Sequence, residues 1–159
     1  MASRSLLTAA SLLLLPLAAA AQSATQVVTF QVAPVRQIAV AGNPAPLVIS
    51  SAVAGSPTLS VTTDGSSYAV TTNEANQKIT ASLDEAMPAG VTLEVTLAPP
   101  TGASGAGAVA LSTGGSDVVT GIAPTSASGL PITYRLSATP AVQLSATTRT
   151  VTFTIVSGT

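Results

Sequence analysis

Apolar and polar side chains alternate residue by residue through much of this chain. The clearest example is Val91 to Leu97, where valine and leucine share one face and threonine and glutamate share the other. Successive side chains of a β-strand point to opposite faces, so a period of two predicts a strand with one buried face. Helical periodicity hardly appears. The chain is therefore expected to be all-β.

The alternating runs recur about every ten residues along the chain. This spacing, with the glycine- and proline-rich loop from Pro99 to Gly107, predicts a single Greek-key, immunoglobulin-like β-sandwich of about 7–10 strands. The expected strands are Gln26 to Val32 (continuing as Ile38 to Val40), Leu59 to Thr63, Tyr68 to Thr72, Lys78 to Leu83, Val91 to Leu97, Val109 to Leu111, Asp117 to Ile122, Ile132 to Leu136 and Arg149 to Val156.

Turns and helices are signalled at few places. Asp64-Gly65 is a strong hairpin signal, and it predicts that Leu59 to Thr63 and Tyr68 to Thr72 form a β-hairpin. A single helical turn is expected around Asn73 to Gln77 or Asp84 to Met87.

The first 21 residues have the order of a secretory signal peptide. Arg4 precedes an apolar run from Leu6 to Ala20, and small residues follow up to Ala21. The run is too short to span a membrane as a helix, which needs about 20 residues. We expect cleavage near Gln22, leaving one domain over residues 22–159.

Composition narrows the location and the partners. Only 7% of the residues are charged and the formal net charge is −1, so no basic patch exists for nucleic acid or for an anionic membrane. After residue 21 no apolar run approaches spanning length. Cysteine and histidine are absent, which fits a secreted prokaryotic protein, extracellular or periplasmic and located at the cell surface.

No arrangement of residues in the sequence indicates a catalytic site. A Ser-Lys mechanism would depend on Lys78, which begins an alternating strand and is interpreted as a solvated strand-end lysine. Asp84 and Glu85 form the only adjacent carboxylate pair, and neighbours in a turn point in different directions. We therefore expect no catalytic residues, no cofactor and no enzyme activity.

Metal binding is equally poorly signalled. Without cysteine or histidine, a designed zinc site is excluded. Calcium would need several converging oxygen ligands, and Asp64 is better interpreted as a turn residue. No metal site is expected.

The four aromatic residues of the predicted domain all lie in strand patterns. Phe30 and Phe153 alternate with valine and isoleucine, so both are expected in the core. Tyr134 is expected to be buried, with its hydroxyl bonded to nearby backbone as in a tyrosine corner. Tyr68 is the least constrained and is expected at an edge or in a loop.

Taken together, the signal segment, the first strand, Ile132 to Ala138 and Arg149 to Ile155 resemble bacterial secreted immunoglobulin-like and pilin-like surface proteins. The resemblance implies a β-sandwich at the cell surface and identifies no binding residues. The disulfide common in usher-type pilins is missing.

Two functions remain open. The first is a non-enzymatic structural or interaction subunit of a fimbria, filament, matrix or coat. Its partners would be other copies or other surface proteins, joined by β-strand addition through Gln26 to Val32. The favoured interpretation of that strand is nevertheless pairing within its own sandwich. The alternative function is a secreted ligand-binding module, for example for glycans, acting through the loops at Pro99 to Gly107 and Gly114 to Asp117.

Overall fold

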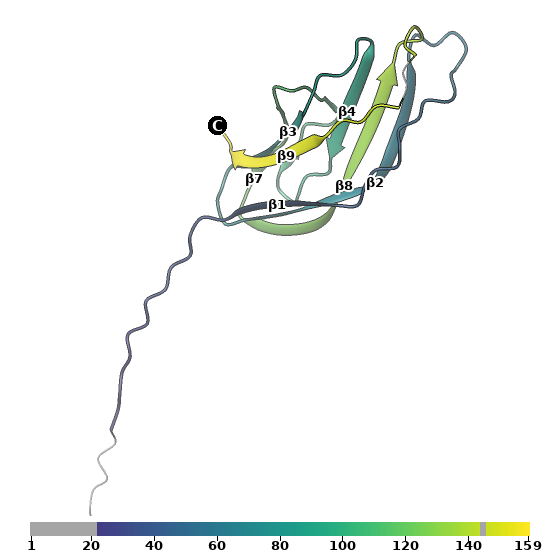
Figure 1. Ribbon diagram of the computed structural model, residues 1–159. Helices are drawn as coiled ribbons and strands as arrows, with labels where there is room; N and C mark the ends of the chain where they lie inside the picture. The colour runs from purple at the N-terminus through teal and green to yellow at the C-terminus, as the bar shows by residue number, and fades with distance from the viewer. Residues whose placement is uncertain (1–21, 144–145) are drawn as a thin grey trace, which may run out of the picture. The chain divides into compact units, whose positions relative to one another are not determined.

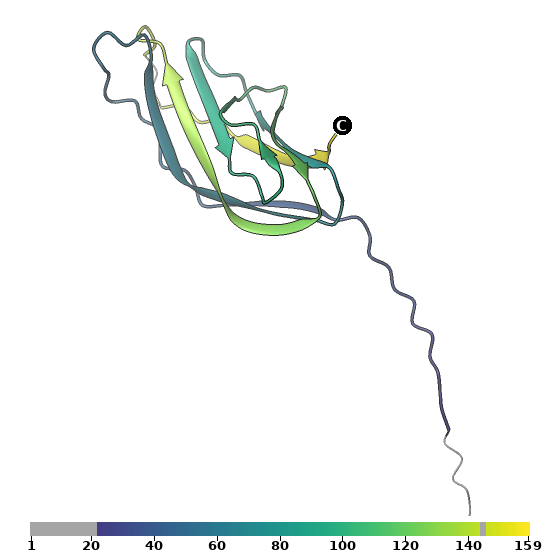
Figure 2. The ribbon, with the colours of Figure 1, turned by 180° about the vertical axis from the view of Figure 1, so that it is seen from behind.

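The computed structural model describes residues 22–143 and 146–159, so the predicted signal peptide lies outside the described residues. The chain divides into two units after Val32, and the two are described separately. The larger unit, Ala33–Thr159, consists of two antiparallel sheets packed face to face (Figures 1 and 2). No helix occurs among the described residues. The prediction of an all-β sandwich is confirmed, while the Greek-key, immunoglobulin-like type stays a prediction.

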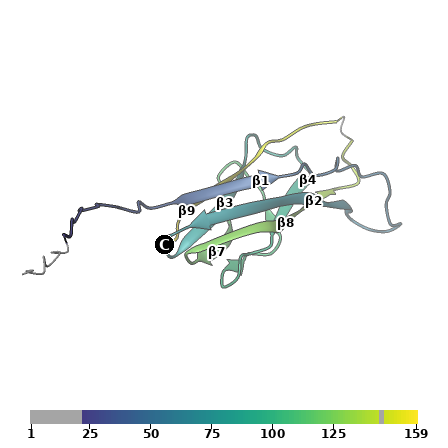
Figure 3. The ribbon, with the colours of Figure 1, turned by 90° about the horizontal axis from the view of Figure 1, so that it is seen from below.

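β1 is an edge strand of one sheet and β9 is an edge strand of the other. These two strands are in contact, so they lie on the same side of the sandwich. Figure 3 shows β1, β2 and β8 side by side in the larger sheet. The first sheet has the order β1 (Arg36–Ala41), β2 (Leu59–Thr72), β8 (Thr125–Ala138), β4 (Val91–Leu97), β6 (Val109–Ala110). The second has the order β5 (Ser104–Gly105), β7 (Ser116–Ile122), β3 (Gln77–Leu83), β9 (Val151–Ser157).

The predicted hairpin at Asp64-Gly65 is wrong. Both of its arms belong to β2, a strand of 14 residues that runs along the equally long β8. The register shifts between Thr63 and Ser66, so the Asp-Gly pair forms an irregularity within the strand, with Gly65 at φ 110°. A glycine at positive φ serves a bulge as well as a turn, and pairing with β8 favours the bulge.

The core lies between the two sheets and consists of the inward faces of the alternating strands. In β4 all four apolar residues are buried and in β3 the alternate positions are buried, as the period of two predicts. The fully buried side chains of largest volume are Tyr68, Ile79, Ile122, Ile132, Val70, Val95, Val118 and Val119.

The remaining predicted elements fall close to their expected places, apart from the loop at 99–107, the helical turn and the first strand. The loop from 99 to 107 contains the short edge strand β5, which pairs with β7. The helical turn expected at 73–77 or at 84–87 is wrong. The backbone bends at 73–76, just before β3 begins at Gln77, and it is bent or irregular at 84–87.

The first expected strand, at residues 26–32, is also wrong. The described N-terminal segment, residues 22–32, has no regular secondary structure and is exposed throughout. Phe30, predicted as core, is 89% exposed, and Val28 and Val32 are exposed with it. An alternating pattern gives a segment one apolar face, but a strand also needs a neighbouring strand to bond with. The apolar side chains of this segment are therefore left in solvent.

Candidate functional site

Lys78 and Asp84 both make contacts that join neighbouring elements of the sandwich. Lys78 donates from Nζ to Oδ2 of Asp117 at 3.1 Å, across the β3–β7 pair. Asp84 accepts the backbone N–H groups of Glu85 at 2.9 Å and Thr150 at 3.0 Å. The Thr150 N–H is the main cause that holds the pKa of Asp84 below its usual value, and desolvation opposes it. These contacts join the turn after β3 to the segment before β9.

No cluster of three or more histidine, cysteine, aspartate or glutamate side chains that could hold a metal occurs within the described part of the chain. Asp64 accepts a hydrogen bond from the Thr133 hydroxyl at 2.8 Å. That contact stabilises the irregular stretch of β2 against β8.

The two tyrosines divide their roles differently from the prediction. Tyr68, expected at an edge, is only 1% exposed, and its hydroxyl donates to the Ala98 carbonyl at 2.6 Å. Burial raises its pKa to about 12. Tyr134 is buried as predicted, and burial also raises its pKa. Phe153, predicted as core, packs against the core but stays half-buried.

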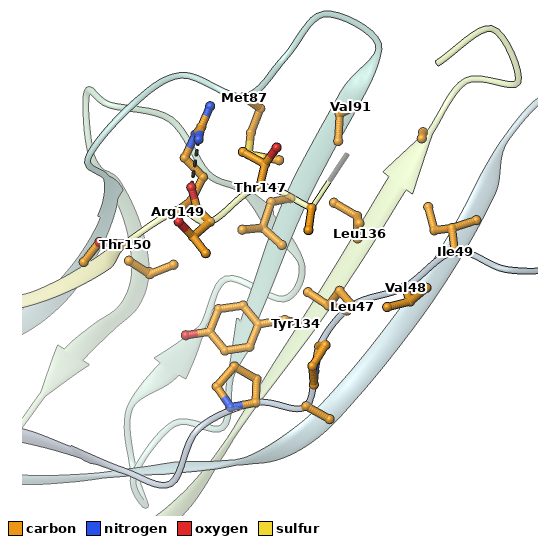
Figure 4. Close-up of a pocket in the computed structure, with 18 of the residues that line it drawn as sticks. Leu47, Val48, Ile49, Met87, Val91, Tyr134, Leu136, Thr147, Arg149 and Thr150 are labelled. Atoms are coloured by element: carbon orange, nitrogen blue, oxygen red, sulfur yellow. Dashed lines mark hydrogen bonds between the residues drawn. The ribbon is translucent and has the colours of Figure 1, made fainter. Parts of the chain in front are cut away.

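One concavity of the sandwich is a mainly apolar groove of about 1000 Å³. Figure 4 shows Leu47, Val48 and Ile49 on one side of it and Arg149 and Thr150 on the other. Tyr134 and Leu136 of β8 lie between these two sides (Figure 4). We call this concavity the groove; residues 42–49, which follow β1, and 146–151, which lead into β9, form its two walls.

The groove exists because both sheets stop short at this end of the sandwich. The second sheet ends at the pair Leu83 and Val151. In the first sheet, β1 pairs only with the last six residues of β2, so the first part of β2 has no strand on that side. Irregular segments therefore take the places of two strands, and they cover the inner face of β8 incompletely.

The polar groups at the groove are few. Arg149 is its one charged lining residue in the described chain, and it donates from Nε and Nη2 to the Ala86 carbonyl at 3.3 and 3.1 Å. Ser66 also lines the groove; it is buried, and its hydroxyl has no hydrogen-bond partner. A buried hydroxyl without a partner costs about 1–3 kcal/mol.

Sequence reasoning missed this site. The run Leu47-Val48-Ile49 is apolar but does not alternate, and nothing in the local sequence shows that it borders a groove. The loops at 99–107 and 114–117, predicted as a ligand site, line neither the groove nor the shallow pocket beside Leu59.

Among the described residues, no helix has the length and hydropathy needed to cross a bilayer. The chain matches no family model, and neither curated proteins nor solved structures contain a significant match to it.

Proposed function

We propose that this protein is an exported, non-enzymatic structural subunit of a cell-surface fimbria, filament, matrix or coat. The observation that carries the proposal is the N-terminal segment. Its residues 26–32 alternate apolar and polar side chains as a strand does, yet Val28, Phe30 and Val32 are exposed. A segment of this kind can add a strand to a neighbouring sheet, where main-chain hydrogen bonds give affinity and alternate side chains fill pockets.

The surface of the sandwich supports the same function. Outward positions of β4 and β9 carry exposed threonines, including Thr92, Thr152 and Thr154. Threonine favours β-strands and carries no charge. These positions therefore give the sheets little electrostatic protection against association. A subunit that packs against copies of itself benefits from such a surface.

The experiment that tests this function is the size of the exported protein, isolated without denaturant. Light scattering after size exclusion, followed by negative-stain imaging, should show ordered filaments or large discrete assemblies. Deleting residues 22–32 should reduce them to monomers. A parent protein that stays monomeric at every concentration, or a deletion that assembles unchanged, contradicts the proposal.

The alternative is a secreted ligand-binding module. The observation in its favour is the groove, whose volume of about 1000 Å³ suits a small molecule and whose lining is mainly apolar. It fits an apolar ligand better than a glycan, because sugar recognition uses exposed aromatic rings and the groove's aromatic residue, Tyr134, is buried. Binding of small apolar ligands in the groove, together with a monomeric state, would favour the alternative.

A further inference from the structure

We propose that the groove binds an uncharged amphiphile, a molecule with one linear apolar chain and a hydroxyl or carbonyl group that bonds to the Ser66 hydroxyl. This rests on the alternative function, which it narrows to one class of ligand and one recognising residue. It does not depend on assembly of the chain. The residues that line the groove all belong to the sandwich unit.

Ser66 is a buried polar residue of the groove whose hydroxyl has no hydrogen-bond partner. It is 7% exposed, and its side chain lies on the inner face of β2, as those of Tyr68 and Val70 do. Buried polar atoms in folded proteins nearly always have a partner, and a missing partner destabilises the fold. A serine at this inward position therefore points to a polar atom that a ligand brings into the groove.

The groove is elongated along the strands of the first sheet. Leu59 and Ser66 both line it and both belong to β2. At the rise of a β-strand, the stretch between these two residues covers roughly 20 Å. Leu136 lies between the two walls along this length (Figure 4). A space of this shape suits one extended apolar chain, with the polar group of the ligand at the Ser66 end.

The wall at the Ser66 end is held in a fixed conformation. Gly42 begins it with φ 77°, and a Cβ there would lie 2.5 Å from the Gly65 carbonyl oxygen, so this wall passes directly against β2 beside Ser66. Pro44 and Pro46 follow, and each proline fixes its own φ and favours an extended residue before it. Such a wall keeps the groove formed before a ligand arrives, as is usual for small-molecule sites.

The electrostatics of the groove disfavour a charged head group. Arg149 is the charged lining residue of the described chain, and all three of its guanidinium nitrogens are engaged. Nε and Nη2 donate to the Ala86 carbonyl, while Nη1 donates to the Thr148 carbonyl at 2.8 Å and lies 3.7 Å from a carboxylate oxygen of Glu85. A ligand carboxylate would lose its water without gaining a cation. A hydroxyl or carbonyl is matched by Ser66, whose hydroxyl can both donate and accept.

Calorimetric titration of the exported full chain with linear primary alcohols tests the apolar part of the site. Across hexanol, octanol and decanol, the dissociation constant should fall about three- to fourfold for each added methylene. Octanoate at neutral pH should bind at least about tenfold more weakly than octanol, because its charge has no free cation to meet. An affinity that does not depend on chain length, or octanoate bound as tightly as octanol, would contradict the proposal.

The variant Ser66→Ala tests the polar contact. It should raise the dissociation constant of hexanol about fivefold, the equivalent of one hydrogen bond, and leave that of chlorohexane, which has the same chain without a hydroxyl, unchanged. Ser60→Ala is the matched control, since Ser60 is exposed in the same strand and lies outside the groove. Thermal unfolding of Ser66→Ala should occur at or above the temperature of the parent, because the substitution removes a buried hydroxyl without a partner.

Two further matched variants place the ligand in the groove. Val48 lines the groove and is 64% exposed, and Val53 lies in the same connecting segment, outside the groove, and is 77% exposed. Val48→Asp should weaken octanol binding at least about tenfold, because a carboxylate would meet the apolar chain, and Val53→Asp should bind like the parent. Circular dichroism checks that both variants fold. Equal binding by the two variants, or an equal loss in both, would overturn the location.

The outcomes separate this proposal from the functions proposed above. If hexanol and chlorohexane both bind and Ser66→Ala changes neither affinity, the groove lacks head-group recognition; the proposal fails and the ligand-binding alternative stands. If the parent binds no alcohol and no chlorohexane, the proposal and that alternative fail together, and the structural function, which is measured by assembly, is unaffected. Loss of alcohol binding in Ser66→Ala and Val48→Asp, with both controls unchanged, supports the proposal.

Discussion

Replacing Tyr68 with phenylalanine should destabilise the sandwich measurably while keeping its packing. The ring is 1% exposed and its hydroxyl donates to the Ala98 carbonyl at 2.6 Å, just after the end of β4. The substitution removes the donor and leaves a part-buried carbonyl without it, which costs about 1–2 kcal/mol. For a unit of this size the unfolding temperature should fall by roughly 3–8 °C.

The pH dependence of stability provides a second readout of the same group. Burial raises the pKa of Tyr68 to about 12 in the folded protein from 10.0. A folded-state pKa above the unfolded value means that the stabilisation is complete below pH 10 and is lost as the pH rises towards 12. At pH 11 the loss amounts to about 1.4 kcal/mol. The Tyr68→Phe variant should not lose the stability that depends on the Tyr68 phenol. Burial also raises the pKa of Tyr134, so the stability that this variant still loses at high pH should come from Tyr134.

Urea unfolding followed by circular dichroism at pH 7 and pH 11 measures both effects. Tyr134→Phe is the matched control, since it removes the other buried phenol and leaves the bond from Tyr68 to Ala98 in place. The reasoning is refuted if Tyr68→Phe is as stable as the parent at pH 7, or if it loses as much stability as the parent between pH 7 and pH 11.

Three further outcomes are expected. Phe30→Ala should raise the concentration for half-assembly about 30- to 160-fold, corresponding to about 2–3 kcal/mol of lost burial, and should leave the unfolding temperature unchanged; light scattering across a dilution series measures this concentration. Gly42→Ala should cost about 1–3 kcal/mol in urea unfolding, because Gly42 has φ 77° and a Cβ there would lie 2.5 Å from the Gly65 carbonyl oxygen. Asp84→Asn should lower the unfolding temperature at pH 7. The Thr150 N–H lowers the pKa of Asp84, so the stabilisation from the Asp84 carboxylate is present above pH 3.8 and is lost below it. Thermal unfolding from pH 2 to 7 should therefore show a smaller acid-induced fall in unfolding temperature in the variant than in the parent.

Period-two patterning predicted the central strands well because burial alone decides them. β4 has the predicted bounds, Val91–Leu97, and its apolar face is buried along its whole length. In such a strand the hydrophobic pattern, the β-propensity and the tertiary environment agree. A sequence is informative at these positions without any knowledge of which strands become neighbours.

The hairpin failed for a reason that the local sequence does not contain. Asp64-Gly65 satisfies a tight turn and an irregular strand equally well, since Gly65 supplies a positive φ in either case. The choice depends on β8, which lies about 60 residues further along the chain and is long enough to pair with both arms. The groove was missed for the same reason, because its walls are segments with no strand pattern of their own.

The two failures at the N-terminal segment and at the groove both involve apolar surface. A strand-like segment with Val28, Phe30 and Val32 in solvent is an aggregation hazard, and proteins commonly interrupt such segments with a charge or a proline. Here residues 22–32 contain neither. The same chain leaves an apolar groove beside β9, which pairs with no second strand of the described chain, and a buried serine hydroxyl without a partner. The proposed structural function accounts for the exposed segment, because a segment with this pattern can add a strand to a neighbouring sheet.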